Sequence, residues 1–473
     1  MIGELLKENW EGLKNYRESL KKGDKIVWMI IILLLIISII VMFSSTSLLA
    51  SNSRSPLSRV DIFKDQLVIV IIGAFFIGLC YLIPSVKIFR GLSQLGWVIS
   101  VGLLSMLSAG FKIGDILKAE EINGAVRTLG LFGMQIHVYE VVKVAMVMYM
   151  AWAIHTLKED KFRLINYLTK KYKKLSFLSS ETWKIWLYIF LPLLSVVGLI
   201  LRGGGSSAIF IGGILFITTI FGKFKIKYYL QFIALGIVAL AFAVFINVVS
   251  GGEKFVRFNT IWSRTSTNNM EIVENEPINS KAFNDAVDKL RQPEGAKIAI
   301  KEGSIIGKLP GNSTQKYEVP LIYNDYVYSF IIEEYGLLGA FGILWIFGSL
   351  LARGILIVTN SPGLFEKAAV GGLVILISGQ ALFHMIINAD FGILTGQTLP
   401  MISHGASSFI CFSIALGVIL SLSKLTSDKI DEYKEQLGPI SQSDEDNPDA
   451  LHDIAQFEEN KEDLKLEEGE IYE

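Results

Sequence analysis

An acidic and a basic residue stand three positions apart at the start of an apolar stretch. In Tyr139-Glu-Val-Val-Lys143, the side chains of Glu140 and Lys143 would share one face of a helix. Charges in or beside a membrane span are costly and are functional candidates by default. The pair therefore predicts either a charged wall of a polar cavity or a neutralising pair that only packs a helix bundle.

Two further polar residues precede this pair, Arg127 and Gln135. The guanidinium group is a planar fork that suits phosphate oxygens, whereas an arginine near a membrane interface can also simply extend its head group into water. An anion-binding role and an interfacial role both remain open for Arg127.

Two later regions are also rich in polar residues. The first holds Asp285 and Asp288, then Lys297 and Gln315, and is the densest polar stretch of the long loop. The second is Thr398-Leu-Pro-Met-Ile-Ser403-His-Gly-Ala-Ser-Ser408, between two apolar runs. Non-helical backbone at membrane depth is tolerated only where it lines protein or a wet cavity, so this stretch is predicted to be re-entrant.

These residues need a scaffold of membrane helices. The chain has 473 residues, of which 51% are hydrophobic, and apolar blocks alternate with short charged stretches. About 20 apolar residues cross roughly 30 Å of hydrocarbon as a helix, and lipid demands that backbone groups pair internally. We expect an all-α polytopic membrane protein of about ten spans, at 26–43, 66–83, 91–109, 138–155, 185–201, 206–221, 230–249, 336–352, 368–388 and 406–423.

The basic residues of the short loops predict the orientation. With a cytoplasmic N-terminus, the cytoplasmic stretches hold 21 Lys and Arg and the short outer loops hold 7, as the positive-inside rule requires. Ten spans then place the C-terminus in the cytoplasm as well. The long loop of about 250–326, between spans seven and eight, lies outside, and loops of that length are usually functional or disordered.

Three regions follow from this pattern. Residues 1–25 are predicted to be a cytoplasmic segment with an amphipathic helix on the membrane surface, and residues 26–425 the transmembrane domain. Residues 426–473 should be an acidic, disordered cytoplasmic tail, because 17 acidic and 4 basic residues follow from Asp428 onward. The tail is either a docking segment or a solubilising one. Cys80 and Cys411 lie in apolar runs, so no disulfide framework or zinc site is indicated, and no nucleic-acid partner is predicted.

Several short motifs together resemble the SEDS family (shape, elongation, division and sporulation) over about residues 23–425. They occur in the order of that family: Asn123-Gly-Ala-x-Arg127, Phe132-Gly-x-Gln135, Glu140-x-x-Lys143, Ala296-Lys-Ile-Ala-Ile300, Gly311-Asn-Ser-Thr-Gln315, Glu333-Glu-Tyr-Gly-Leu337, Leu399-Pro-x-Ile-Ser403 and Gly405-x-Ser-Ser408. Gly23-Asp-Lys25 before the first span and Ser44-Ser-Thr-Ser47 after it resemble the division branch more than the elongation branch.

The resemblance implies a peptidoglycan glycosyltransferase that joins lipid II units at the outer face of the bacterial cytoplasmic membrane. It implies an aspartate of the large outer loop as general base, at Asp285, with Asp288 as the alternate. Glu140 and Lys143 would complete the catalytic group.

Further roles follow from the same likeness. Arg127, Gln135, Lys297, Gln315 and Ser403 would bind or orient the substrate. A divalent cation, Mg²⁺ or Mn²⁺, could assist at the pyrophosphate. The implied partners are lipid II, membrane lipids, a class B penicillin-binding protein that acts as transpeptidase, and other division proteins at the septum.

The chain also departs from the family pattern. Arg202-Gly-Gly-Gly-Ser-Ser207 lacks the usual acid, and Asp285 lacks the expected Asp-Pro-x-Gly context. Two alternatives therefore stay open: a lipid II flippase or other lipid transporter, and a non-catalytic scaffold that activates a transpeptidase. A transporter would not need a carboxylate in the outer loop, and a scaffold would form no glycan chains even with its partner present.

Overall fold

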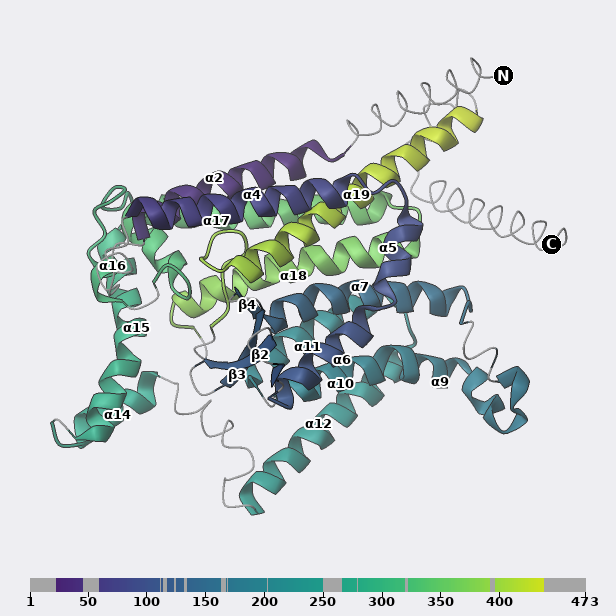
Figure 1. Cartoon of the computed structure of the whole chain (residues 1–473), viewed down its shortest axis with the longest axis horizontal. Coiled ribbons are helices and arrows are strands. Elements are labelled where there is room, and N and C mark those ends of the chain that lie inside the picture. Colours follow the sequence, from purple (N-terminus) through teal and green to yellow (C-terminus); the bar gives the residue numbers. More distant parts are fainter. Residues whose placement is uncertain are drawn as a thin grey trace.

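The computed structural model shows a bundle of membrane-spanning helices (Figure 1). It describes residues 23–437, except 46–58, 111, 114–116, 123–124, 132–133, 163–166, 168, 202, 250–265, 279, 320–321 and 392–395. Within these residues, nine helices are long and apolar enough to cross a membrane. The chain is a multi-pass membrane protein, as the apolar runs predict.

Each predicted span coincides with a helix or a pair of consecutive helices. The spans are α2 (Lys25–Ser45), α4 (Arg59–Tyr81), α5 (Val86–Ser93) with α6 (Gly96–Ser108), α7 (Val138–Lys158), α9 (Glu181–Ile185) continued through the π-helical turn η2 (Trp186–Phe190) into α10 (Leu191–Leu201), α11 (Gly205–Thr219) with η3 (Ile220–Gly222), α12 (Ile226–Val249), α17 (Val327–Asn360), α18 (Leu364–Asn388) and α19 (Ala406–Leu437). Of these, α12 is counted apart from the nine, because only Ile226–Ile237 qualify as a shorter apolar helix there. A 3₁₀ helix, η1 (Lys173–Ser179), precedes α9.

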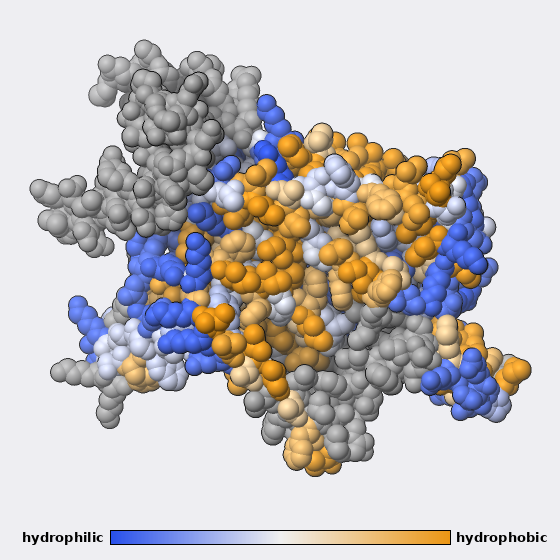
Figure 2. Space-filling view, turned by 180° about the vertical axis from the view of Figure 1, so that it is seen from behind, coloured by the Kyte–Doolittle hydropathy of each residue, from blue (hydrophilic) through white to orange (hydrophobic). Residues whose placement is uncertain are grey.

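The core is built by α7, α18 and α19. Between 72% and 78% of the apolar window of each is buried, against 22% for α4. The apolar side chains of the peripheral helices therefore face outward, and Figure 2 shows them as a broad hydrophobic surface with hydrophilic residues gathered at both ends. This distribution is that of a helix bundle whose solvent is lipid.

The segment before α7 forms a small antiparallel sheet that the sequence analysis did not predict. Its strands are β1 (Lys112–Ile113), β2 (Leu117–Ile122), β3 (Ala125–Leu131) and β4 (Met134–His137), in the order β1-β2-β3-β4. The register pairs Thr128 with His137 and Gly130 with Gln135. We call the end of the bundle that carries this sheet the sheet end. The sequence does hold a signal for it, because Asn-Gly at 123–124 between two strands is a strong indication of a hairpin.

Three helices follow α12 at the sheet end: α14 (Ser266–Asn275), α15 (Lys281–Gly303) and α16 (Gln315–Glu318). Figure 1 shows that α14 and the first half of α15 project away from the bundle, while the end of α15 lies against α17. The large predicted loop thus contains a long helix. At the other end, α19 continues to Leu437, beyond the point at which we expected the acidic tail to begin. The predicted helix in residues 1–25 lies almost entirely outside the described residues.

Helix α17 breaks at Gly336, which has φ +68° and ψ −167°. The break lets the backbone N–H groups of Leu337 and Leu338 donate to the carbonyls of Ser304 and Ile305, at 3.0 and 3.3 Å. A Cβ at Gly336 would lie 2.1 Å from the carbonyl oxygen of Ile305. Glycine is needed here both for the positive φ and for the close backbone approach.

Replacing this glycine should therefore destabilise the protein. We expect Gly336→Ala to lower the melting temperature of the purified protein, since a positive φ combined with ψ near 180° costs about 1–3 kcal/mol for a residue with a Cβ and the clash adds to it. Gly342→Ala is the matched control, because a Cβ there meets nothing within 4 Å. Equal melting temperatures for the two variants would show that the break at residue 336 is not required.

Candidate functional site

The ammonium group of Lys143 is the centre of a buried polar network at the sheet end. Its Nζ donates to Glu140 Oε1 at 2.7 Å, Gln380 Oε1 at 2.6 Å and Gln397 Oε1 at 3.1 Å. The side chain is 1% exposed, and its Nζ lies 5.8 and 5.9 Å from the ring centroids of Phe210 and Phe412. Three acceptors use the three donors of an ammonium group, so this charge is compensated within the protein.

The network draws on several elements. Glu140 and Lys143 come from α7, Gln380 from α18, and Gln397 from the segment between α18 and α19. Gln397 Nε2 donates to Ser207 Oγ of α11 at 3.0 Å. Glu140 is 12% exposed, and it is therefore the member of the ion pair that can reach a substrate.

A polar stripe on α18 supports this network. Gln380, His384 and Asn388 recur every four residues, so they lie on one helix face, and all three are buried. The Nδ1 atom of His384 lies 2.7 Å from the carbonyl oxygen of Gln397. The spacing is visible in the sequence, but these residues were not singled out there.

Asn388, the last residue of that stripe, fixes the start of α17. Its Oδ1 accepts from the backbone N–H and the hydroxyl of Ser329, at 3.0 and 2.9 Å. Its Nδ2 donates to the carbonyl oxygen of Asp325 at 3.1 Å. The backbone of Asp325, just before α17, is thereby held against the end of α18.

The carboxylate of Asp325 is the acidic group that the structure adds to the site. It lies over Gly396, where a Cβ would be 3.7 Å from Oδ1. Within the described residues it accepts no hydrogen bond. Burial raises the pKa of Asp325 to about 6, and the positive charge of Arg127 opposes the rise. A carboxylate with such a pKa is poised to exchange protons near neutral pH.

Arg127 lies on β3, and its positive charge acts on Asp325. Its Nε donates to the carbonyl oxygen of Gly203 at 3.3 Å, which ties the sheet to the turn between α10 and α11. The pKa of His137 is lowered by burial, with Glu140 opposing the shift and Lys143 and Arg127 adding to it. Arg127, the Glu140–Lys143 pair and Asp325 thus act on one electrostatic environment.

The segment between α18 and α19 is held by the polar residues of its motif. Ser403 Oγ donates to the carbonyl oxygen of Asn324 and accepts from the backbone N–H of Leu399, both at 2.8 Å. Ser407 Oγ donates to the carbonyl oxygen of Gln135 at 2.9 Å, while the Gln135 side chain is exposed. Ser403 is therefore engaged in positioning the residue next to Asp325, and its substrate-orienting role stays a prediction.

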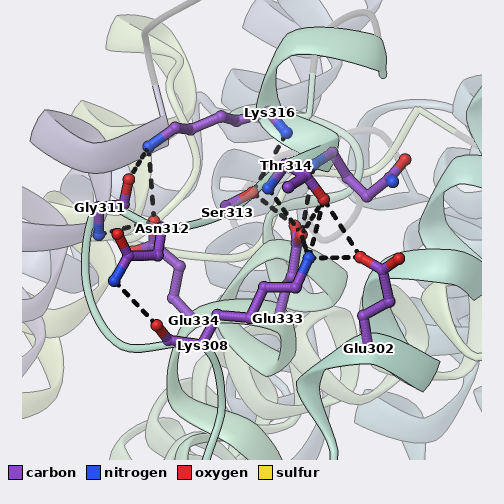
Figure 3. Close-up of polar contacts among 10 residues, drawn as sticks. Glu302, Lys308, Gly311, Asn312, Ser313, Thr314, Lys316, Glu333 and Glu334 are labelled. Carbon is purple, nitrogen blue, oxygen red and sulfur yellow. Dashed lines mark hydrogen bonds and ion pairs between the residues drawn. The ribbon is translucent and has the colours of Figure 1, made fainter.

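Two adjacent carboxylates on α17 hold the Gly311–Gln315 motif from opposite sides (Figure 3). Glu333 Oε1 accepts from Lys308 Nζ and the backbone N–H of Thr314, both at 2.8 Å, and from the backbone N–H of Gln315 at 3.3 Å. Glu334 Oε1 accepts from the backbone N–H of Gly311 at 3.0 Å. The predicted substrate residue Gln315 is thus part of a clamped loop.

Asp285 and Asp288 lie on α15, and both are exposed. Within the described residues neither carboxylate forms an ion pair or a hydrogen bond. Lys297, further along the same helix, pairs with Glu294 and Asp390 at 2.8 Å each, which joins α15 to the end of α18. The C-terminal half of α15 is thus connected to the site through Lys297. Asp285 and Asp288 belong to the half of the helix that projects from the bundle.

The side chains around the site determine how a divalent cation could be bound there. Among the described residues, no three His, Cys, Asp or Glu side chains are grouped as metal ligands. Mg²⁺ is usually held by one or two carboxylates together with substrate phosphates, and Glu140 or Asp325 could supply such a carboxylate. The residues present therefore fit a cation that arrives with a pyrophosphate, but not a site built from protein alone.

Comparison with known proteins places this geometry in a family. The model of the cell cycle proteins FtsW, RodA and SpoVE matches residues 24–428. The chain is 25% identical over 372 residues to the probable peptidoglycan glycosyltransferase FtsW of Pseudomonas fluorescens, which covers 76% of this chain and 77% of that protein. It is 35% identical over 127 residues to the protein of the same name from Caulobacter vibrioides, but this match spans only a third of that relative, 33%, and 27% of this chain.

A solved structure has the same fold. It is described as "Structural coordination of polymerization and crosslinking by a peptidoglycan synthase complex", and one of its chains aligns with a TM-score of 0.58 at 20% identity, over 85% of this chain and 98% of that one. The family model matches nearly the whole membrane-spanning part of the chain, residues 24–428. The chain therefore belongs to the SEDS family of cell cycle proteins, together with FtsW, RodA and SpoVE.

Proposed function

We propose that this protein is a peptidoglycan glycosyltransferase that polymerises lipid II, with a carboxylate of the 250–326 region as general base. The observation that carries the proposal is the desolvated carboxylate of Asp325 at the sheet end, in the field of the Arg127 charge. Relatives that bear the name peptidoglycan glycosyltransferase support it. Asp285 and Asp288 remain candidates, but Asp325 has the better environment for a base.

The chemistry is a direct displacement at a sugar carbon. The acceptor is the 4-hydroxyl of a lipid II sugar, and the donor is a glycan chain on undecaprenyl pyrophosphate. Asp325 takes the hydroxyl proton as the oxygen attacks the anomeric carbon, whose configuration inverts. The bond to the pyrophosphate breaks, and its electron pair leaves with undecaprenyl pyrophosphate. General-base assistance of this kind is worth about 10²–10⁴-fold in rate.

The cationic residues act on the leaving group. Arg127 would contact the pyrophosphate, on which negative charge develops, and fixed positive charge at that place stabilises the transition state. The ammonium of Lys143 is already saturated, so it positions Glu140 and Gln397 and adds its field. A divalent cation, if bound, would supply further charge neutralisation at the pyrophosphate. Lys297 and Gln315 would help to shape the substrate cavity by holding α15 and the clamped loop.

The distribution of basic residues supports an extracytoplasmic site. The excess of Lys and Arg in the loops at the opposite end favours cytoplasmic N- and C-termini, with the sheet end outside. Lipid II would then enter sideways from the outer leaflet. A class B penicillin-binding protein is the expected partner, because the related chain belongs to a peptidoglycan synthase complex that couples polymerization to crosslinking. The division septum is the expected location.

A polymerisation assay separates this function from its alternatives. Purified full-length protein, alone and with its transpeptidase partner, is given labelled lipid II, and glycan chains are resolved by gel electrophoresis. We expect chains whose formation depends on Asp325. Movement of lipid II across vesicles without chain formation would favour a transporter, and a stimulated transpeptidase without chains would favour a scaffold.

A further inference from the structure

Two hydroxyl groups extend the Lys143 network and close it into a ring. Ser408 Oγ donates to Glu140 Oε2 at 3.5 Å, and the hydroxyl oxygens of Thr398 and Ser408 lie 2.8 Å apart. Gln380 Nε2 donates to Thr398 Oγ1 at 3.3 Å, while Gln380 Oε1 accepts from Lys143 Nζ at 2.6 Å. Because Lys143 Nζ also donates to Glu140 Oε1 at 2.7 Å, these side chains form a closed ring of hydrogen bonds.

The ring depends on the packing of three helices at the sheet end. Helix α7 supplies Glu140 and Lys143, and α18 supplies Gln380. Ser408 lies in the first turn of α19, and Thr398 lies in the segment before that helix. The three helices pack against one another (Figure 1). Lys143, Gln380 and Ser408 are 1%, 0% and 5% exposed, and hydrogen bonds removed from water in this way are electrostatically stronger than in solution.

Every hydrogen bond in the ring has a fixed direction. An ammonium group can only donate, and an ionised carboxylate can only accept. Lys143 therefore requires Oε1 of Gln380 as its acceptor, which turns the amide N–H groups of Gln380 toward Thr398. On the other side, Glu140 takes the hydrogen of Ser408, so the oxygen of Ser408 is left to accept from Thr398. Both constraints give the same order, in which each hydroxyl accepts from the amide side and donates toward Glu140 Oε2.

The two oxygens of Glu140 are held differently. Oε1 accepts from Lys143 at 2.7 Å, whereas among the described residues Oε2 accepts only the longer bond of 3.5 Å from Ser408. The side chain of Glu140 is 12% exposed, more than that of Lys143. Oε2 is therefore the oxygen with acceptor positions open to a substrate, and the Ser408 hydroxyl sets its place.

We propose that Thr398 and Ser408 are positioning residues for the Glu140 carboxylate. Ser408 holds Oε2 directly, and Thr398 acts through Ser408 by donating to the oxygen of that serine. The inference rests on the proposed function, because it gives Glu140 a contact with the lipid-linked substrate. A small misplacement of such a group lowers the rate of reaction even when the substrate still binds.

The test is a double-mutant cycle on lipid II polymerisation by the purified full-length protein, with the transpeptidase partner present. Ser408→Ala should lower kcat about tenfold and leave KM within about twofold, because a hydrogen bond to a charged group is lost. Thr398→Val should lower kcat about threefold, since it weakens the same bond from one step away. The variant with both changes should match Ser408→Ala, because Thr398 acts only through Ser408. Thr398→Ser, which keeps the hydroxyl, should retain the kcat of the parent.

The variants are chosen to leave the fold in place. Thr398→Val keeps the link to α18, because Gln380 Nε2 also donates to the backbone carbonyl oxygen of Thr398 at 2.9 Å. Two buried hydroxyls outside the ring are the matched controls. Thr218 donates within α11 to the carbonyl oxygen of Ile214 at 2.8 Å, and Ser421 of α19 donates to the carbonyl oxygen of Ile83 at 3.4 Å. Thr218→Val and Ser421→Ala should keep the kcat of the parent.

The cycle distinguishes positioning from a role in packing alone. Losses of kcat that multiply in the double variant would overturn the proposal, and so would a Thr398→Ser variant as slow as Thr398→Val. Unchanged kcat in Ser408→Ala, with an active parent protein, would overturn it and leave the proposed function intact. A parent protein that forms no chains even with its partner would contradict the proposed function, and this proposal with it.

Discussion

Asp325→Asn should lower the rate of lipid II polymerisation by about 10²–10⁴-fold, the usual worth of a general base. An amide has nearly the same shape as the carboxylate but cannot accept the proton of the acceptor hydroxyl. The measurement is the initial rate of glycan-chain formation by the purified full-length protein, with the transpeptidase partner present. The matched control is the double variant Asp285→Asn/Asp288→Asn, which should retain activity because both residues are exposed on the projecting half of α15.

The pH dependence gives this prediction a second readout. Burial raises the pKa of Asp325 to about 6, and only the deprotonated form can act as a base. Activity should therefore rise with pH to a plateau above about 6 and fall tenfold per pH unit below it. The Asn variant should lose this dependence in its residual activity.

Stability should move in the opposite direction. A carboxyl whose pKa is higher in the folded than in the unfolded state makes folding less favourable as the pH rises through that range. At pH 7 Asp325 thus destabilises the fold, and Asp325→Asn should melt at the same or a higher temperature. Loss of activity in the double variant on α15, with full activity in Asp325→Asn, would instead assign the base to Asp285 or Asp288.

Glu140→Gln should reduce both activity and stability. It leaves the ammonium of Lys143, which is 1% exposed, without its counter-ion. Breaking a buried ion pair by removing one partner costs about 3–5 kcal/mol, because an uncompensated charge stays buried. The melting temperature and the polymerisation rate per folded molecule are the two measurements.

The double variant Glu140→Gln/Lys143→Met separates the two effects. With both charges removed, the buried unpaired ion disappears and stability should return toward that of the parent, but polymerisation should not. The control is Lys424→Met, which removes another buried ammonium at the opposite end of the bundle, where it donates to the carbonyl oxygen of Tyr81 at 2.8 Å. That variant should lose stability and keep its activity per folded molecule. Recovery of polymerisation in the double variant would leave the pair with a packing role only.

The structure connects Glu140 and Lys143 to partners that no local sequence pattern indicates. The three-residue spacing of Glu140 and Lys143 predicted their ion pair, which the structure shows at 2.7 Å. Nothing near them pointed to Gln380 or Gln397, which lie more than 230 residues away along the chain. The four-residue spacing of polar residues on α18 indicates that they share one helix face. Only the packing of α18 against α7 shows that this face meets Lys143.

The hairpin before α7 and the candidate general base differ in how far the sequence could predict them. Asn-Gly at 123–124 predicts a turn by local backbone preference, so the sheet was within reach of the sequence. Asp325 was not, because a raised pKa comes from desolvation by groups brought together in space. The resemblance pointed to Asp285, with Asp288 as the alternate, and both are exposed on α15 whereas Asp325 is desolvated.

The sequence by itself determined the membrane-spanning architecture, the positions of the spans and the family, because hydrophobic length and charge placement act locally along the chain and lipid admits few other solutions. The tertiary structure decided which carboxylate is desolvated and which ammonium is saturated. Each of those properties depends on the distance between groups remote in sequence, and burial in a low-dielectric interior sets their energies.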